Sequence, residues 1–308
     1  MRTNRFMAVL TAAVALMAGF AAGAGVLLRG SGATESVTSA RGETYEMATD
    51  GIYAFNSIRV VAEGIGWDVF TLVIAVPALL VATVWVARGS FRGRLVAVGL
   101  LGYFAYMYLE YAVTWAFGPL FLLFIAIYAA SLLGIVGIGA ALASEGLVDR
   151  FDATFPRRSW AALSMGMAFL LTVLWIGRIV EGLTGPVTLK GETTMTIPAL
   201  DLGLVVPASA LIALFALRRR PAGLAAAAAF AVTFTAMCAA IGSMLVSAWL
   251  VTGVLELPPI LVFGVASAAG LISGARMFRA VRPVERATTS PLTNTKAAEL
   301  PAADAVGV

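Results

Sequence analysis

The sequence predicts an all-α protein, a polytopic bundle of about eight transmembrane helices. The first observation is composition: of 308 residues, 60% are hydrophobic and 12% are charged, and the mean hydropathy is +0.94. A water-soluble domain carries about twice that charged fraction. The other two observations are the recurrence of apolar stretches of membrane-spanning length and the concentration of basic side chains in alternate connections.

A transmembrane helix needs about 20 apolar residues to cross roughly 30 Å of hydrocarbon. The stretches that meet this requirement are 6–28, 67–87, 95–117, 119–143, 160–182, 201–217, 222–252 and 258–278. We therefore assign residues 1–282 to a transmembrane domain with an outer loop at 29–66. Residues 283–308 are rich in Pro, Thr, Ala and Asn, which predicts a disordered cytoplasmic tail.

The distribution of basic residues predicts the orientation. If the N-terminus is cytoplasmic, sixteen of the 21 basic side chains lie on the cytoplasmic side. These are Arg2, Arg5, Arg88, Arg92, Arg94, Arg150, Arg157, Arg158, Arg218, Arg219, Arg220, Arg276, Arg279, Arg282, Arg286 and Lys296. The remaining five are Arg29, Arg41, Arg59, Arg178 and Lys190. Both termini are therefore predicted to be cytoplasmic, and the outer side is predominantly acidic.

Two segments near the N-terminus allow more than one interpretation. Residues 6–28 resemble a signal peptide at Ala22-Gly23-Ala24, but their apolar length suits an uncleaved anchor better; cleavage would leave seven spans. In the outer loop, the Gly/Ser/Thr/Glu-rich first half is expected to be mobile. The second half, 51–66, has apolar residues at helical spacing and is expected to lie as an amphipathic helix on the outer interface.

Two parts of the chain share features that indicate an internal repeat. Pro77 precedes Arg88 by eleven residues, and Pro207 precedes Arg218 by the same spacing. The fourth and eighth predicted spans also both open on proline. Four spans per half would give parallel repeats related by an axis along the membrane normal. Coincidence is the alternative, because prolines at span entries and basic inner loops are common.

Glu110 is the most informative polar residue, because the span numbering puts it about 8 Å inside the hydrocarbon. An ionised carboxylate at that depth must face protein or water. Tyr103 and Tyr106 lie on the same helical face at offsets of seven and four residues. This stripe indicates a proton- or cation-responsive site, or else a carboxylate satisfied by tyrosine hydroxyls or by Arg178 that fixes helix packing.

Three further charged residues are candidates for a ligand-binding site with Glu110, Tyr103 and Tyr106. Asp68 and Asp201 each open a predicted span, where capping of a helix N-terminus competes with cation coordination as their role. Arg178 either pairs with Glu181, meets Glu110 across the bundle, or extends towards the membrane interface.

The composition excludes several chemistries. Histidine is absent and Cys238 is the only cysteine, which excludes zinc sites of the His/Cys type, intramolecular disulfides and Ser-His catalysis. The sequence has no P-loop, nucleophile elbow or dinucleotide fingerprint. We predict no catalytic residues, no metal site, no cofactor and no nucleic-acid partner.

Several short pieces resemble a group of bacterial multipass membrane proteins to which no activity is assigned. They span roughly residues 50–225 and comprise Gly51-Ile-Tyr53, Asp68 to Pro77, Arg88 to Arg94, Gly102-Tyr103-Phe104, Pro119 to Leu123, and Asp201 to Pro207 leading to Arg218–Pro221. The chain departs from the group at Gly118, where asparagine is expected. The resemblance implies a bacterial cytoplasmic (inner) membrane location and supplies no catalytic residues.

The leading functional hypothesis is transport or sensing of a small solute or cation through an outward-facing polar cavity. The competing hypothesis is a structural or assembly protein that binds a membrane-protein partner through glycine-rich helix faces such as Gly19-x-x-x-Gly23 and Gly270-x-x-x-Gly274. A lipid-modifying enzyme that uses carboxylates is a third possibility. In each case the surrounding partner is the lipid bilayer.

Overall fold

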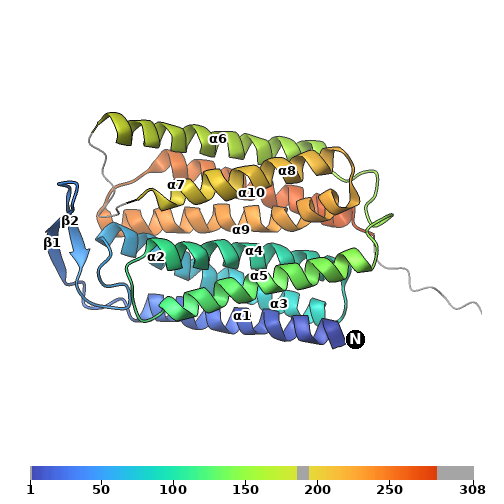
Figure 1. The fold of residues 1–308 in the computed structure, drawn as a ribbon, viewed down its shortest axis with the longest axis horizontal. Helices are drawn as coiled ribbons and strands as arrows, with labels where there is room; N and C mark the ends of the chain where they lie inside the picture. The colour runs from blue at the N-terminus through green and yellow to red at the C-terminus, as the bar shows by residue number, and fades with distance from the viewer. Residues whose placement is uncertain (1, 186–193, 283–308) are drawn as a thin grey trace, which may run out of the picture.

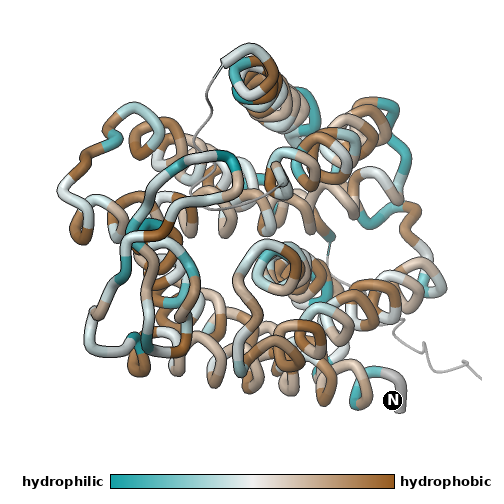
Figure 2. Tube along the Cα trace, turned by 60° about the vertical axis from the view of Figure 1, so that its left-hand side comes forward, coloured by the Kyte–Doolittle hydropathy of each residue, from teal (hydrophilic) through white to brown (hydrophobic). Residues whose placement is uncertain are grey.

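The predicted all-α bundle of eight spans is confirmed by a computed structural model, which describes residues 2–185 and 194–282. Within those residues, eight helical segments are long and apolar enough to cross a membrane. They are α1 (Arg2–Leu27), α2–η1–α3 (Ile58–Phe70, Thr71–Ala75, Val76–Ala87), α4 (Phe91–Thr114), α5 (Phe121–Ser144), α6 (Arg157–Thr184), α7–η2–α8 (Thr196–Leu200, Asp201–Val205, Val206–Leu217), α9 (Pro221–Thr252) and α10 (Leu257–Arg279). Hydrophobic residues line these helices along most of their length (Figure 2).

The segment between α1 and α2 differs from the prediction. Its first half is a β-hairpin of β1 (Thr34–Thr38) and β2 (Thr44–Ala48), antiparallel with Thr34 opposite Ala48. Its second half is not a helix on the interface, because α2 begins at Ile58 and continues into the second span. The Ser57 hydroxyl accepts the Val60 N–H and caps this helix. The predicted tail at 283–308 lies outside the described residues.

The spans form two groups of four, which Figure 1 shows as a lower and an upper layer. The first half contains α1, α2–α3, α4 and α5, and the second half contains α6, α7–α8, α9 and α10. Helix α9 packs against both α2 and α4 and so forms most of the contact between the halves. We call the end that carries β1 and β2 the hairpin end, and the opposite end, with the α3–α4 and α8–α9 turns, the arginine end.

The two halves repeat the same local structure at positions 130 residues apart, which supports the predicted parallel repeat. The second span of each half changes to a π-helix, at Thr71–Ala75 and at Asp201–Val205, and each π-helix is followed by a proline, Pro77 or Pro207. A π-helical segment within an α-helix often marks a functional site.

The turn after each of these spans is also repeated. Gly89 and Arg219 occupy the same place and have positive φ angles of 72° and 54°. The backbone hydrogen bonds around this turn also match. The Arg88 N–H donates to the Val84 carbonyl in the first half, and the Arg218 N–H donates to the Leu214 carbonyl in the second. Many helices end in a turn of this kind. The turn, the proline and the π-helix all recur at the same spacing of 130 residues, and on that combination we interpret the halves as repeats.

Two glycines bring the halves into close contact. A Cβ atom at Gly66 would lie 2.5 Å from the Ser243 carbonyl oxygen of α9, and one at Gly99 would overlap the Ala229 carbonyl oxygen. The hydroxyl of Ser243 donates to the Gly66 carbonyl at 2.7 Å, and that of Thr233 donates to the Gly99 carbonyl at 2.7 Å. Helix α9 therefore approaches α2 and α4 through the same combination of a glycine backbone and a hydroxyl donor.

Candidate functional site

The six residues predicted to line one cavity lie instead around two sides of α4. Asp68 and Tyr103 belong to a closed network inside the first half, whereas Tyr106 and Asp201 connect the two halves. Glu110 lies on α4 and is 7% exposed. The structure therefore separates the predicted site into two clusters.

Asp68 is the centre of the first cluster. Its side chain is 1% exposed, and its carboxylate accepts hydrogen bonds from the Tyr53 hydroxyl at 2.6 Å and the Tyr111 hydroxyl at 3.3 Å. It lies in the middle of a continuous helix, so the predicted capping role is wrong for Asp68. Gly25 of α1 leaves the space for this carboxylate, because a Cβ atom there would overlap Asp68 Oδ2.

Tyr53 lies outside the spans and closes this cluster from the hairpin end. Burial and the neighbouring Asp68 carboxylate raise the pKa of Tyr53 well above its ordinary value, so its hydroxyl stays protonated as a donor. Its ring also packs against Trp115 with centroids 4.5 Å apart. Tyr53 was missed as a partner of Asp68, because the only sequence signal is an aromatic residue in a loop fifteen positions earlier.

Tyr103 does not line a cavity. It is 0% exposed, and its hydroxyl pairs with the Thr71 hydroxyl at 2.7 Å at the start of the first π-helix. Together with the Asp68 hydrogen bonds, this pair fixes α2 against α4 within the first half.

Asp201 is the centre of the second cluster and starts the second π-helix, at the position that Thr71 holds in the first half. It is 8% exposed, and its carboxylate accepts hydrogen bonds from the Tyr106 hydroxyl at 2.5 Å and from the Trp175 indole N–H at 2.8 Å. The predicted capping role is also wrong for Asp201, because α7 starts five residues earlier, at Thr196. The three residues join α4, α6 and the π-helix η2.

Glu110 lies beside both clusters, because its carboxylate acts electrostatically on the hydroxyls of Tyr103 and of Tyr106. The carboxylates of Glu110 and Asp201 both act electrostatically on the Tyr106 hydroxyl. Arg178 lies one turn after Trp175 on α6 and forms an ion pair with Glu181 at 3.6 Å, which is one of the three alternatives that the sequence left open for it. Trp175 lies three residues before Arg178, so the two share one face of the helix. This spacing is the sequence signal that could have identified Trp175 as a site residue.

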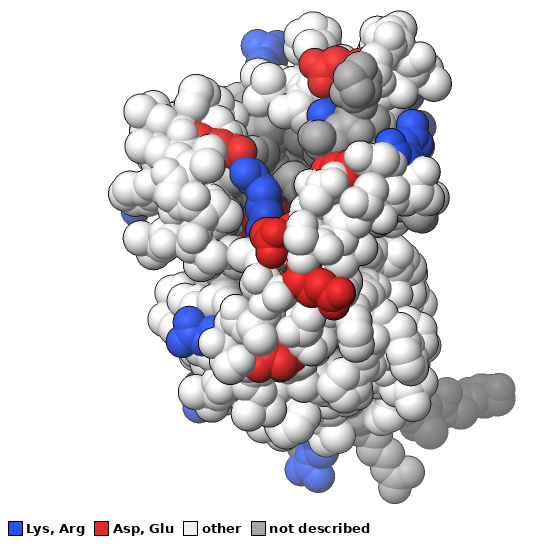
Figure 3. All heavy atoms as spheres, turned by 90° about the vertical axis from the view of Figure 1, so that its left-hand side faces the viewer, with Lys and Arg blue, Asp and Glu red and all other residues white. Residues whose placement is uncertain are grey.

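Charged side chains border a hollow in the face of the molecule at the hairpin end (Figure 3). Arg59 of α2 pairs with Glu63 at 2.8 Å and with Glu256, just before α10, at 2.7 Å. The Arg59–Glu256 pair therefore joins the two halves at this end. In the described part of the chain, no group of three or more Cys, Asp or Glu side chains is placed to hold a metal ion.

Comparisons with protein-family models, with curated proteins and with solved structures gave no match. The second cluster places a buried carboxylate with two neutral hydrogen-bond donors at the contact between the two repeated halves.

Proposed function

We propose that this integral membrane protein binds a cation or a small cationic solute at Asp201 and transports or senses it. The proposed site comprises Asp201, Tyr106, Trp175 and Glu110, and we propose that the ligand reaches it from the hairpin end. We further propose that the hairpin end is extracellular and the arginine end cytoplasmic, in a bacterial cytoplasmic membrane.

The observation that carries the proposal is the surroundings of Asp201. Among the described residues its hydrogen-bond partners, Tyr106 and Trp175, are neutral, and no salt bridge joins it. An ionised carboxylate within a bilayer is costly unless a positive charge compensates it. A bound cation would supply that charge while both neutral donors keep the carboxylate oriented.

The location of Asp201 supports a transport or sensing role over simple binding. Tyr106 belongs to the first half and Asp201 to the second, so a ligand at Asp201 acts directly on the contact between the halves. Transporters built from repeats carry their sites at such a contact, commonly beside interrupted helices. A ligand that binds one arrangement of the halves more tightly shifts the population towards it.

The glycine faces do not favour the competing assembly role. Gly270 and Gly274 face Thr235 and Ala231 of α9, and Gly19 faces Val76 of the first half. These contacts lie within the bundle, so the Gly270/Gly274 face and the Gly19 position are already used for intramolecular packing, whereas Gly23 has no atom within 4 Å of its built Cβ position.

Stabilisation by cations tests the proposed site. We expect Na⁺, Li⁺, K⁺ or ethylammonium, titrated at constant ionic strength, to raise the melting temperature of the purified protein saturably. At about 100 times the dissociation constant, a ligand specific for the folded state contributes about 2.7 kcal/mol. Asp201→Asn should abolish the response, because the amide has no charge to neutralise.

Glu35→Gln is the matched control, since it removes one exposed carboxylate on β1 that does not belong to the Asp201 cluster. It should leave the response unchanged. The proposal is overturned if none of the four cations stabilises the protein, or if Asp201→Asn responds like the wild type.

The orientation is tested by cysteine labelling in intact cells. In a Cys238→Ala background, Ala40→Cys in the hairpin should react with a membrane-impermeant maleimide added outside. Ser144→Cys at the arginine end should react only after the cells are permeabilised. The reverse pattern would contradict the proposed orientation.

A further inference from the structure

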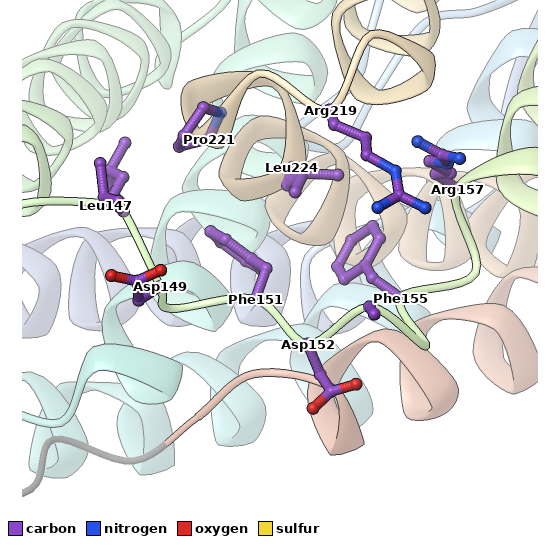
Figure 4. A pocket seen from close by; sticks show the side chains of 11 residues that line it. Leu147, Asp149, Phe151, Asp152, Phe155, Arg157, Arg219, Pro221 and Leu224 are labelled. Carbon is purple, nitrogen blue, oxygen red and sulfur yellow. The ribbon is translucent and has the colours of Figure 1, made fainter.

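A pocket of about 260 Å³ opens at the arginine end, between the α5–α6 connection and the α8–α9 turn. Figure 4 shows its lining, with two arginines at one rim and apolar side chains beneath them. The pocket is separate from the Asp201 cluster, which lies near the hairpin end of the same bundle.

Two guanidinium groups meet at this rim from different elements. Arg157 is the first residue of α6, and Arg219 lies in the turn before α9. The Arg157 Nη1 donates to the Leu217 carbonyl at 3.3 Å, which holds Arg157 beside that turn, and the Arg219 charge acts on it directly. Neither arginine forms a salt bridge within the described residues. Like charges held together in this way favour an anion between them.

Arg219 occupies a backbone conformation that arginine rarely adopts. Its φ angle is +54°, and the equivalent residue of the first half is Gly89, at +72°. A side chain at such an angle costs of order 1 kcal/mol relative to glycine. The second half therefore carries a guanidinium group where the repeat itself accommodates glycine.

Two helix N-termini add positive potential to the same rim. Helices α6 and α9 both begin there, and neither has a side-chain hydrogen bond at its N-cap residue, Pro156 or Arg220. The N–H of Arg157 donates to the Phe155 carbonyl, and Pro221 has no N–H. The second and third residues of each helix still carry N–H groups without intrahelical partners, and these favour negative charge.

The acidic residues of the pocket do not neutralise this rim. Asp152 is paired with Arg282 at 3.2 Å and accepts the Thr154 N–H at 3.0 Å. Asp149 is exposed, and Figure 4 shows it at the opposite side of the pocket, beside Leu147.

The floor of the pocket is apolar. Phe155 and Leu224 are 5% and 8% exposed, and Phe151 and Pro221 complete the surface. The pocket lies at the level of the helix ends, where lipid headgroups meet the ends of the spans. A phosphate group with an attached hydrocarbon chain fits both the charged rim and this floor, whereas free phosphate uses the rim alone.

We propose that this pocket binds the phosphate of an anionic phospholipid headgroup between Arg157 and Arg219, with the glycerol and upper acyl chain against Phe155 and Leu224. The assignment is independent of the proposed cation site.

Arg219→Gly is the decisive variant, because glycine suits the turn and the fold should be retained or slightly stabilised. In dodecylmaltoside micelles, we expect added dioleoylphosphatidylglycerol to raise the melting temperature of the wild type. Arg219→Gly should need at least about tenfold more lipid for the same rise, equivalent to about 1.4 kcal/mol of binding energy. Arg157→Gln should behave similarly, and dioleoylphosphatidylcholine should give no comparable rise.

The double variant Arg88→Gln/Arg218→Gln is the control, since it removes two positive charges at the same end without changing the pocket lining. It should keep the wild-type response. An equal loss of response in this control would show that the lipid is attracted by positive charge in general, and would overturn the proposed site. An unchanged response in Arg219→Gly would overturn it as well. A full response to millimolar inorganic phosphate alone would overturn the lipid as the source of the phosphate.

Discussion

Replacing Gly66 and Gly99 with alanine is expected to separate the two halves of the bundle. At both positions the new Cβ atom would meet a backbone carbonyl of α9, at 2.5 Å for Gly66, and backbone atoms cannot move aside as a flexible side chain can. Overpacking of this kind costs about 1–3 kcal/mol per site, so the double variant should lose about 4 kcal/mol. Each substitution should also weaken the hydroxyl hydrogen bond that α9 donates to the glycine carbonyl.

Thermal unfolding in detergent, followed by tryptophan fluorescence, measures this effect. Gly166→Ala is the matched control, because Gly166 lies on the exposed face of α6 with no atom within 4 Å of its built Cβ position. Alanine favours helix over glycine by about 1 kcal/mol in peptides, so the control should be neutral or stabilised. A Gly66→Ala/Gly99→Ala protein as stable as this control would contradict the close contact between the halves.

Asp68→Ala is expected to produce the second largest loss, because it removes the acceptor of the buried Tyr53 hydroxyl. It also removes one of the two acceptors of the buried Tyr111 hydroxyl, the other being the Gly64 carbonyl. An unsatisfied buried polar group costs about 1–3 kcal/mol, and the lost packing adds to this cost. We expect about 3–4 kcal/mol in total, which corresponds to a fall in melting temperature of roughly 8–12 °C for a chain of this size. Asp68→Asn should lose less, since its amide oxygen still accepts one hydrogen bond.

A double-mutant cycle separates this structural role from ligand binding. Tyr53→Phe alone should cost about 1 kcal/mol, and Asp68→Ala/Tyr53→Phe should be more stable than the sum of the single losses predicts. If Asp68→Ala melted at the wild-type temperature but lost the response to cations, the interpretation would be reversed. Asp68 would then belong to the binding site and Asp201 would not suffice.

Hydropathy predicted the second and sixth spans but not where they begin. Arg59 and Glu63 lower the local hydropathy, so the second span was expected to begin at 67, whereas the helix starts at Ile58. The structure compensates these charges through Arg59–Glu63 and Arg59–Glu256, and the second pair depends on a residue almost 200 positions away. A local window cannot detect a charge that is neutralised by a distant partner.

The candidate site was only partly predictable, for a related reason. Tyr103 and Tyr106 are three residues apart on a helix, so their side chains point about 60° away from each other. Side chains that diverge in this way can contact two different neighbouring helices, whereas the sequence analysis expected both to line one cavity. In the structure Tyr103 bonds to Thr71 in its own half, and Tyr106 bonds to Asp201 in the other half.

The sequence by itself determined the helical class, the number of spans and the presence of carboxylates at depth, because each follows from transfer energies that act residue by residue. The spacing of Pro77 and Arg88 and its repetition at Pro207 and Arg218 also indicated the duplication. Only the tertiary structure decided that Asp68 is enclosed while Asp201 bridges the halves. Asp68 is enclosed because Gly25 of α1 leaves space for its carboxylate beside Tyr53 and Tyr111. Asp201 bridges the halves because it meets Tyr106 of α4 and Trp175 of α6. These contacts join residues far apart in the chain, and a local sequence pattern does not encode them.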